Sequence, residues 1–512
     1  MPCMSLKIFS HCAIAVVWLA VGLFVGSAVY NLVFSPLANY PGPLLAKVSS
    51  LPDFYWSMTG SRHLWLARNH EIYGDVVRYR PDGLMFRTPN AYRDIFSSKS
   101  NVKRFKFYDM MTRNEVDKSI ITGTDVAHHA QKKRAISTLF SDKAIRAMEP
   151  ILLEHVSRWC QLLVDDDDKG CWSTPRKMSQ MCDCLVLDVL CDLCFGRSVR
   201  TKEPGGNEYR KVPHIIAKFL RVLYPLGHSP WLDLLESMAL RLQSEDGRSL
   251  SQENGTTRPD RSDMLHYLIN AKDPNTGHLG YREEALEAEV LTLTIAGSDT
   301  TSVVMAGFFF YIVCSPDVYG RLVNEIRATF TSSDEIRGGK KLSSCKYLHA
   351  CVEEAMRITP AGPAELPRTV LPGGLEVDSD YIPEGTTVGV AHWSFYRNEK
   401  YFHDPDLYFP ERWIVDEQTG VTADDVARAR SSCFPFAAGA IRCAGKNFAL
   451  LELYVTIART LWLYDVRLLP GDTTGGGHEA GEWGRRDPNT FRVMDSYISI
   501  RDGPVVQFRK RV

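Results

Sequence analysis

The sequence predicts a mainly α-helical protein, with a large helical domain around a long central helix, a smaller β-rich portion and one N-terminal transmembrane helix. Three observations support this fold class. Residues 283–314 contain no proline and favour a helix roughly 48 Å long. Short strand-like runs within 76–87 and 369–390 are bounded by proline and glycine turns. Residues 12–34 carry no charged side chain.

The N-terminal apolar segment is long enough to cross a membrane. Residues 12–34 would span roughly 34 Å as a helix, against about 30 Å for a hydrocarbon core. A cleaved signal peptide is the alternative, because residues 26–28 (GSA) resemble a cleavage site, although its apolar region is usually about 7–15 residues long. The proline-rich stretch 36–43 cannot continue the helix. We therefore expect an anchor at 1–35, spanning the membrane at about 12–34, and one catalytic domain at 36–512.

The overall composition is that of an ordinary globular protein. Of 512 residues, 45% are hydrophobic and 24% are charged, with a formal net charge of −1. This balance allows a large core and creates no net field that would attract nucleic acid. The 13 cysteines are odd in number and scattered, which favours a reducing compartment over a disulfide framework. Four of them lie in the apolar run 181–196, where core packing is favoured over zinc binding, since zinc ligands normally converge from turns.

One cysteine near the C-terminus has surroundings suited to binding iron. Cys443 lies in the small-residue loop 436–445 (FAAGAIRCAG), with Gly439 before it and Gly445 after it. The apolar helix pattern 446–463 follows at once, so the free N–H groups of a helix N-terminus would stabilise a thiolate. The glycines let the backbone approach a large flat ligand, as a haem iron with an axial cysteine requires. A small buried hydrophobic side chain is the alternative for a lone cysteine.

The middle of the predicted central helix breaks several local rules. Residues 296–301 (AGSDTT) place Gly297, Asp299 and two threonines in an apolar helix. Glycine costs up to about 1 kcal/mol there relative to alanine, and buried polar groups are costly unless they are hydrogen-bonded. Such violations together indicate a functional site, in which the glycine admits a ligand while Asp299 and Thr300 hold water and relay protons. A satisfied polar kink in a long helix is the alternative.

Charged residues in two later segments form a further candidate cluster. Glu354 and Arg357, in the predicted helix 346–358, are three residues apart and therefore lie on one face. Arg412, in the segment 409–413 (FPERW), is available to join the same network. Most pairs of this kind are exposed and contribute only about 0–1 kcal/mol, which is the alternative for this one.

Together, these four segments resemble the cytochrome P450 family of haem-thiolate monooxygenases. AGSDTT is similar to the family's oxygen-activation motif, EAMR (354–357) to its Glu-x-x-Arg motif, FPERW to the companion motif, and FAAGAIRCAG to the cysteine loop. Their order and spacing also agree, over essentially the whole chain after the anchor. The anchor and stretches such as YPGPLLAKV and LPRTVLPGG resemble microsomal members from filamentous fungi that act in secondary metabolism.

This resemblance implies a function, a cofactor and partners. A protein with the cytochrome P450 fold would use haem b to insert one oxygen atom from O2 into an apolar small molecule, such as a terpenoid, polyketide or alkaloid. Its electrons would come from NADPH–cytochrome P450 reductase, with cytochrome b5 as an additional donor, since the chain shows no flavin or nicotinamide domain. It would be a single-pass protein of the endoplasmic reticulum membrane with a cytosolic catalytic domain.

The resemblance also implies roles for individual residues. Cys443 would be the axial ligand of the haem iron, and Asp299 and Thr300 would deliver protons. Gly297 would leave room for dioxygen. The other expected haem contacts are loop residues and basic side chains: Phe436, Gly439, Gly445, Arg368, Lys133 and Arg134. The expected ion-pair network behind the cysteine loop comprises Glu354, Arg357 and Arg412.

One position departs from the family pattern. The family's loop carries an arginine two residues before the cysteine, where this chain has Ile441, and Arg442 lies one place later. Arg442 is therefore not expected to pair with a haem propionate, and its side chain is expected at the proximal surface, where a redox partner docks. Arg368 is the preferred propionate partner. Within the basic run 129–134, Lys133 or Arg134 is a second candidate, with a solvated basic face as the alternative.

Two other functions are weighed against monooxygenation. A haem-thiolate isomerase or dehydratase that does not use O2 tends to lack the acid–alcohol pair, which is intact here at Asp299 and Thr300. A non-catalytic haem-binding protein is the second alternative. By position, substrate contacts are expected from residues 101–125, 213–238, the segment before 296, and 361–366, where Glu365 is either a polar contact or an exposed turn residue. The second of these segments is rich in apolar residues, which favours an apolar substrate.

Overall fold

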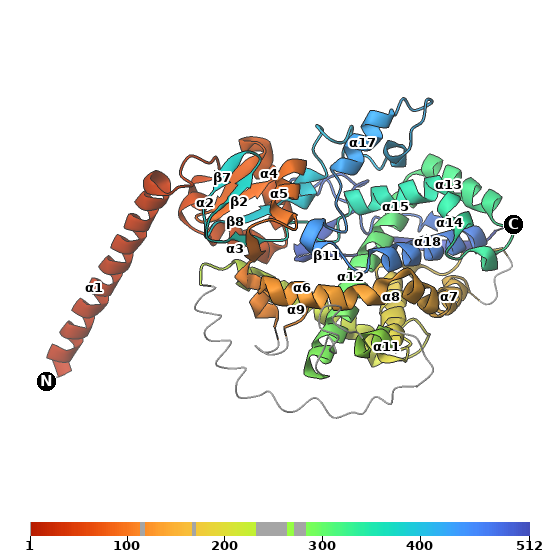
Figure 1. The fold of residues 1–512 in the computed structure, drawn as a ribbon, viewed down its shortest axis with the longest axis horizontal. Coiled ribbons are helices and arrows are strands. Elements are labelled where there is room, and N and C mark those ends of the chain that lie inside the picture. Colours follow the sequence, from red (N-terminus) through yellow and green to blue (C-terminus); the bar gives the residue numbers. More distant parts are fainter. Residues whose placement is uncertain (1, 113–117, 166–169, 232–263, 271–282, 512) are drawn as a thin grey trace.

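The computed structural model describes residues 2–112, 118–165, 170–231, 264–270 and 283–511. A β-rich portion lies beside a larger helical body, and helix α1 (Pro2–Val29) projects away from the β-rich end (Figure 1). A short π-helical turn, Tyr30–Phe34, follows α1. This arrangement agrees with the predicted mainly helical fold with a smaller sheet portion.

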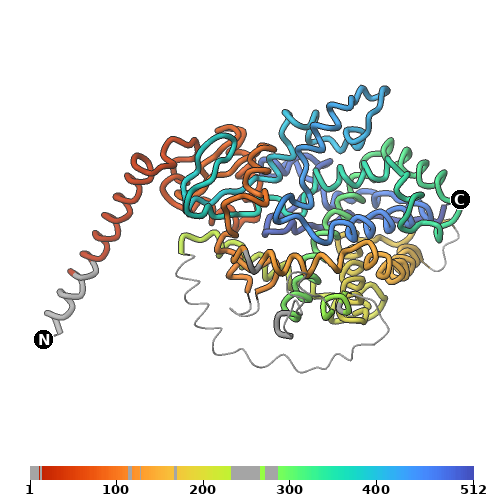
Figure 2. The backbone as a smooth tube through the Cα atoms, in the orientation of Figure 1, coloured from red at the N-terminus to blue at the C-terminus, as the bar shows by residue number. Residues whose placement is uncertain are grey.

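Two helices within the described residues are long and apolar enough to cross a membrane. The first, Ile14–Phe34, is not buried anywhere inside the protein, and the path of the backbone shows it leading away from the body (Figure 2). The second, Leu286–Cys314, is mostly buried and belongs to the central helix of the body. The N-terminal helix is therefore compatible with a membrane anchor, whereas the second is apolar because it is the core.

The main sheet has five strands in the order β1-β2-β8-β5-β3. β1 and β2 form an antiparallel hairpin, β8 runs parallel to β2, and β5 is antiparallel to both β8 and β3. Every residue of β2 and β8 is buried, which explains their apolar composition. β1 (Val76–Arg80) and β2 (Gly83–Phe86) confirm the strands predicted within 76–87, and β5 (Arg368–Val370) and β8 (Thr387–Val390) confirm those predicted within 369–390. The edge strand β3 (Val102–Arg104) was not predicted from the sequence.

Short helices and small sheets complete the β-rich portion and the C-terminal region. The helices are α2 (Leu44–Val48), α3 (Leu51–Thr59), α4 (Arg62–Tyr73), α5 (Pro89–Phe96) and α16 (His392–Phe395). The small sheets are β4-β12-β9, β10-β11 and β6-β7. Their strands are β4 (Arg176–Lys177), β6 (Leu375–Val377), β7 (Asp380–Ile382), β9 (Tyr464–Leu468), β10 (Val493–Ser496), β11 (Ile498–Arg501) and β12 (Val505–Lys510).

The helical body is organised around α12 (Glu283–Cys314), whose bounds are those predicted from the sequence. Residues 301–312 are buried on all sides, so the helix reads as a continuous apolar run rather than an amphipathic one. It packs on α8 and on α15, α13 and α18. The neighbouring helices are α6 (Val126–Ser137), α7 (Asp142–Leu163), α8 (Met178–Phe195), α9 (Val212–His228), α11 (Met264–Ile269), α13 (Pro316–Thr329), α14 (Lys340–Ser344), α15 (Lys346–Ile358), α17 (Ala423–Ser431) and α18 (Lys446–Leu463).

The four clustered cysteines are core residues of α8. Cys182, Cys184, Cys191 and Cys194 are all buried along this helix. Within the described residues, no group of three or more His, Cys, Asp or Glu side chains is placed to hold a metal ion. The apolar helical pattern therefore reflects packing, as predicted.

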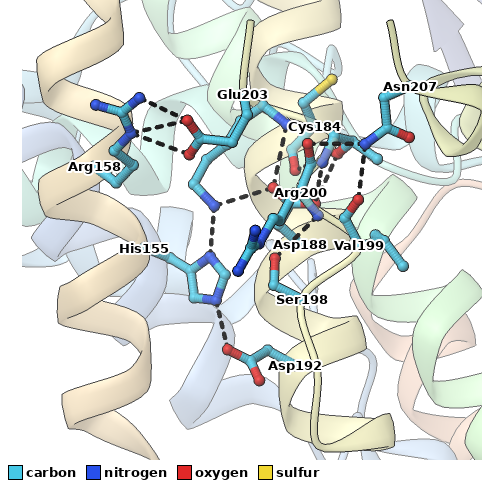
Figure 3. A network of polar contacts seen from close by, with 12 residues as sticks. His155, Arg158, Cys184, Asp188, Asp192, Ser198, Val199, Arg200, Glu203 and Asn207 are labelled. Atoms are coloured by element: carbon cyan, nitrogen blue, oxygen red, sulfur yellow. Dashed lines mark hydrogen bonds and ion pairs between the residues drawn. The ribbon is translucent and has the colours of Figure 1, made fainter. Parts of the chain in front are cut away.

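A polar network fastens the loop after α8 to α7 and α8 (Figure 3). The fully buried Asp188 accepts hydrogen bonds from the Thr201 N–H at 2.7 Å and from the Lys202 ammonium at 3.0 Å. Lys202 also contacts Nδ1 of His155 at 2.7 Å, and the other ring nitrogen of His155 contacts Asp192 at 2.8 Å. Asp188 and Asp192 of α8 therefore hold in place the segment that leads to α9.

Candidate functional site

The cysteine loop is closed by its own backbone. The N–H of Cys443 donates to the Phe436 carbonyl at 2.8 Å, and α18 begins directly after Gly445. Gly439 has a φ of +57°, and a Cβ at that position would lie 2.0 Å from the Phe96 carbonyl oxygen. Only glycine fits there, so the loop glycine is required by local geometry. Gly445 has no such constraint, since a Cβ would meet its nearest neighbour, the ring of Phe140, at an ordinary 3.5 Å.

The Cys443 side chain is exposed but close to other protein atoms. Among the free cysteines of the described residues, only Cys171 and Cys443 are exposed. Burial nevertheless raises the pKa of the Cys443 thiol, while the N–H groups of Gly445 and Lys446 and the Lys133 ammonium oppose this rise. The thiol is therefore accessible to a ligand while protein atoms surround part of it. A soft sulfur ligand that is accessible at a helix N-terminus fits an axial haem ligand.

Two arginines, the buried Arg368 and the partly buried Arg104, lie side by side with no carboxylate of the described residues paired to either. Arg368 and Arg104 are cross-strand partners in β5 and β3. Arg368 donates to the Pro367 carbonyl at 2.7 Å, and Arg104 to the Gly123 carbonyl at 2.8 Å. Within the described residues, no ion pair joins either guanidinium to a carboxylate. Burial lowers the pKa of Arg104 to about 10, and the positive charge of Arg368 adds to this effect.

This arginine pair fits the carboxylates of a haem. Like charges directly opposite each other on a sheet are destabilising, so an anion is needed to offset them. Arginine is also well suited to carboxylates because its planar fork donates two parallel hydrogen bonds. Arg368 was predicted from the sequence, whereas Arg104 was not. Only the strand register, in which Arg104 faces Arg368, reveals it.

The two basic candidates on α6 point to different places. The Lys133 ammonium donates to the carbonyls of Gly439 at 3.3 Å and Ala440 at 2.5 Å, so it touches the cysteine loop directly. Burial and the positive charge of Arg442 lower the pKa of Lys133. Arg134, the next residue, is exposed. Of the two, Lys133 is the side chain that the structure brings to the site.

The hydroxyl groups in the middle of α12 are satisfied by the helix itself. Ser298 donates to the Thr294 carbonyl at 2.8 Å, Thr300 to the Ala296 carbonyl at 2.8 Å, and Ser302 to the Ser298 carbonyl at 2.7 Å. This back-bonding explains how a buried helix tolerates so many polar residues. The polar stretch is therefore less costly than its composition suggests.

Asp299 differs from its neighbours in α12. It is 6% exposed, and its Oδ2 atom has no hydrogen-bond partner within the described structure. Burial raises the pKa of Asp299 to about 7, the Asp183 carboxylate adds to the rise, and Arg501 opposes it. A carboxyl group that titrates near neutrality can both hold and release a proton, as an acid–base group requires.

Gly297 has a neighbour that the sequence did not indicate. A Cβ at this position would lie 2.7 Å from Cδ1 of Leu190 in α8. The close packing of α12 against α8 therefore favours a small residue at this position. That Gly297 also leaves room for dioxygen stays a prediction.

Glu354 lies at the centre of a fully buried ion-pair network. Arg357 donates to it through two nitrogens at 2.7 and 2.9 Å, Arg412 through Nε at 2.9 Å, and the Trp413 indole at 3.0 Å. Burial alone would raise the pKa of Glu354, but Arg357 and Arg412 hold it below its ordinary value. Because neither Glu354 nor Arg357 is exposed, the cluster is unlike the exposed pair that was the alternative.

This network reaches the cysteine loop through one tyrosine. Arg357 donates to the backbone carbonyl of Tyr396 at 2.7 Å. The Tyr396 hydroxyl in turn accepts from the N–H of Phe434 at 3.1 Å, two residues before Phe436. The three predicted residues are therefore brought together, and their contacts extend to the start of the loop.

Arg442 lines a surface hollow beside the cysteine loop. The hollow has a volume of about 260 Å³ and an apolar interior that includes Phe436 and Leu450. Arg430 and Lys446 also line it, as does Glu353, which pairs with Arg430 at 3.4 Å. Ile441, at the position where the family has an arginine, packs instead against the core under the main sheet.

Two of the expected substrate segments meet in an aromatic cluster. Phe107 packs against Tyr224 of α9 at 5.9 Å between ring centroids, and against Tyr497 at 5.6 Å.

Glu365, expected as a substrate contact or an exposed turn residue, is neither in this structure. It is buried, and both of its oxygens accept from the Arg62 guanidinium. Part of the segment 213–238 lies outside the described residues.

Comparisons with known proteins agree with this geometry. The family model for Cytochrome P450 matches residues 41–475. The chain is 33% identical to the cytochrome P450 monooxygenase AKT7 of Alternaria alternata, over 96% of each protein. It is also 33% identical to the cytochrome P450 monooxygenase poxM of Penicillium oxalicum, over 95% of this chain and 93% of the relative. The monooxygenase atnE of Emericella nidulans is 32% identical over 97% and 96%, respectively.

Removing the central carboxylate of the ion-pair network should destabilise the protein strongly. Glu354→Ala leaves the buried Arg357 and Arg412 without their anion, which we expect to lower the free energy of unfolding by about 3–5 kcal/mol. Denaturant unfolding of the detergent-solubilised chain, followed by circular dichroism, measures this loss. The matched control is Glu353→Ala, because Glu353 pairs with a 56% exposed Arg430 and should cost at most about 1 kcal/mol. Equal losses in both variants would contradict the assignment.

Proposed function

The chain belongs to the cytochrome P450 family and is a monooxygenase that uses haem and O2, and we propose that it oxidises an apolar small molecule of fungal secondary metabolism. The proposed reaction inserts one oxygen atom from O2, as a hydroxylation or a related oxidation. The observation that carries it is Cys443, which is exposed just before the start of α18. The fungal sources of its relatives support the metabolic setting.

We assign the haem contacts from the described geometry. Cys443 would hold the iron of haem b, and Arg104 and Arg368 would receive the propionates. Lys133 would brace the cysteine loop by its hydrogen bonds to the Gly439 and Ala440 carbonyls. When bound, a thiolate-ligated haem supplies the activation of O2 with two electrons delivered from outside.

Asp299 and Thr300 are the proposed proton-delivering residues. The Thr300 hydroxyl donates to the Ala296 carbonyl. The lone pairs of the Thr300 hydroxyl oxygen can therefore accept a hydrogen bond from another donor. Asp299, with a pKa raised by burial to about 7, can supply the proton. As the pH rises above 7, this carboxyl group ionises, so proton delivery should weaken on the alkaline side.

The ion-pair network has a supporting role in this proposal. Glu354, Arg357 and Arg412 lie behind the cysteine loop and reach it through Tyr396. A fixed loop keeps the Cys443 thiol in one orientation, as a ligand must be held before it binds. The network would therefore act on the site without touching the cofactor.

The proposed substrate is apolar because of the side chains that meet between the substrate segments. Phe105, Phe107, Tyr108 and Tyr224 form one buried cluster, with Met110 and Met111 packed against it. Aromatic and apolar walls bind ligands mainly by excluding water, with few polar groups fixing orientation. A terpenoid, polyketide or alkaloid scaffold suits such walls.

The proposed location is the endoplasmic reticulum membrane, with residues 1–35 as a single-pass anchor and 36–512 as a cytosolic catalytic domain. α9 supports this, since Ile215, Phe219 and Val222 leave 58–65% of their surface exposed on one face. α9 packs on α3, which follows the anchor region. An exposed apolar face beside an anchor favours contact with lipid. The proposed electron donors are NADPH–cytochrome P450 reductase and cytochrome b5.

The iron ligand is tested by a spectrum. The reduced protein with carbon monoxide should show the strongly red-shifted band of a thiolate-bound haem, and Cys443→Ala should lose it because no sulfur remains at that position. The control is Cys433→Ala, ten residues earlier in the chain, which should keep the band. Retention of the band in Cys443→Ala would remove this ligand assignment.

Proton delivery is tested by the coupling of NADPH use to product. In Thr300→Ala, product formed per NADPH should fall about tenfold or more, with hydrogen peroxide released instead, because a positioned proton-transfer group is lost. Thr300→Ser keeps the hydroxyl and should stay close to the wild type. Coupling in the wild type should decline as the pH rises above about 7, where Asp299 ionises. Unchanged coupling in Thr300→Ala would exclude Thr300 from proton delivery.

Membrane attachment is tested by truncation. The full chain should resist extraction from membranes by alkaline carbonate, whereas a chain lacking residues 1–35 should be released by it. The truncated chain should still bind neutral vesicles through α9, and Val222→Asp should weaken that binding severalfold because it places a charge on the apolar face. Val415→Asp, at a similarly exposed residue far from α9, is the control and should leave binding unchanged. Carbonate release of the full chain would exclude a spanning anchor.

A further inference from the structure

The side of α12 that carries Asp299 meets two charged residues from other elements. α12 packs on α8, which carries Asp183, and on β11, which ends at Arg501. Asp183 and Arg501 are the charged groups that act on the Asp299 carboxyl. Both lie far from Asp299 in the sequence, so only the fold brings the three together.

Arg501 is held by contacts that stop just short of Asp299. Its Nη2 atom pairs with the Asp183 carboxylate and donates to the Ser302 hydroxyl at 2.7 Å. Ser302 in turn donates to the backbone carbonyls of Ser298 at 2.7 Å and Asp299 at 3.2 Å. The guanidinium is therefore one hydroxyl group away from the backbone of Asp299.

A buried donor and a buried acceptor are left without partners here. Nε of Arg501 and Oδ2 of Asp299 are both buried, and neither has a hydrogen-bond partner within the described residues. Buried unpaired groups of this kind are rare in native proteins and call for an explanation. A direct Arg501–Asp299 pair would satisfy both, but Asp183 and Ser302 hold the guanidinium elsewhere.

The three side chains also differ in exposure, from the edge of the protein to its core. The Asp183 side chain is 22% exposed and that of Arg501 is 7% exposed, while Asp299 is 6% exposed. The outermost group is an anion that can exchange protons with water. The innermost is the carboxyl group that the proposed function uses.

We propose that Asp183 and Arg501 are positioning residues for Asp299, with Asp183 holding the guanidinium away so that the Asp299 carboxyl can be recharged with protons from the α8 side. This inference rests on the proposed role of Asp299 as a proton donor. A guanidinium does not lose its proton, so Arg501 acts only by its position. While it stays on Asp183, Asp299 can be protonated. If it moved to Asp299, the pair would hold that carboxyl ionised.

The proton balance of this arrangement is simple. When Asp299 delivers its proton in the proposed reaction, its carboxyl group becomes a carboxylate. This carboxylate attracts Arg501. A proton from solvent at the exposed edge near Asp183 then neutralises Asp299, and the guanidinium returns fully to Asp183. No oxidant or reductant takes part, because only protons are exchanged.

Asp183 is distinguished from the other acids of its helix. Asp188 and Asp192 face the network that holds the loop after α8, where Lys202 and His155 engage them (Figure 3). Asp183 alone among these three is paired with a residue of β11. The same helix therefore supplies both the test residue and a matched control.

The test is an infrared titration of the resting holoenzyme, without turnover. The C=O stretch of a protonated buried carboxyl, assigned by its loss in Asp299→Asn, should titrate with a midpoint near 7. Asp183→Asn removes the anion and frees Arg501, so the midpoint should fall by about one pH unit or more. Arg501→Gln removes the cation and leaves Asp183, so the midpoint should rise by a similar amount. Asp192→Asn should leave it unchanged.

Opposite shifts in Asp183→Asn and Arg501→Gln support the proposal, and an unchanged midpoint in both, or shifts of the same sign, overturns it. Arg501→Lys retains the charge and should shift the midpoint less than Arg501→Gln, which keeps the test valid if the glutamine variant folds poorly. A different result would contradict the proposed function. If Asp299→Asn turns over with unchanged coupling, Asp299 is not the proton donor, whatever its midpoint.

Discussion

The buried carboxylate of Glu354 is the interaction on which the cysteine loop depends. It accepts from two guanidinium groups, an indole N–H and the Phe409 N–H, so both of its oxygens are fully used. Arg357, fixed on one side by this charge, uses its remaining N–H groups on backbone carbonyls of Tyr396 and Pro405. One negative charge thereby organises α15 and the chain before Cys443. The network is costly to break because each partner is desolvated only in the presence of the others.

Two buried acids in this fold have pKa values shifted in opposite directions, for identifiable reasons. Arg357 and Arg412 keep Glu354 ionised, with its pKa below the ordinary value. Asp299 forms no ion pair with a cation of the described residues, and burial raises its pKa to about 7. Burial alone is not evidence of function, however, since Glu452 in α18 is also buried and its pKa is raised to about 8 with no charged neighbour contributing. Asp299 differs from Glu452 because charges of both signs act on it, and such control is what a proton-exchanging group needs.

The sequence was sufficient where local rules decide the structure. The central helix, the helix at 346–358 and the helix after Cys443 have the bounds that their unbroken apolar patterns indicate. It was insufficient where contacts join distant segments. Arg104 matters because the strand register places it opposite Arg368. Glu365 is buried because Arg62, from a distant helix, neutralises it. Gly297 stands out in the sequence, but the Leu190 side chain that packs against it comes from another helix.

Arg442, the arginine that lies one place later than in the family pattern, can be explained by the positions of Arg104 and Arg368. Ile441 occupies the inner position and packs against the core, so the loop gains apolar contact where relatives would have a charge. Arg442 is directed to the exposed hollow instead, beside Arg430 and Lys446. If Arg104 and Arg368 hold both propionates, the loop needs no cation at position 441. The displaced charge then joins a lining of three cations and the single carboxylate of Glu353, which leaves this surface net positive. Such a surface attracts an acidic electron donor at long range, and this attraction would weaken as salt is added.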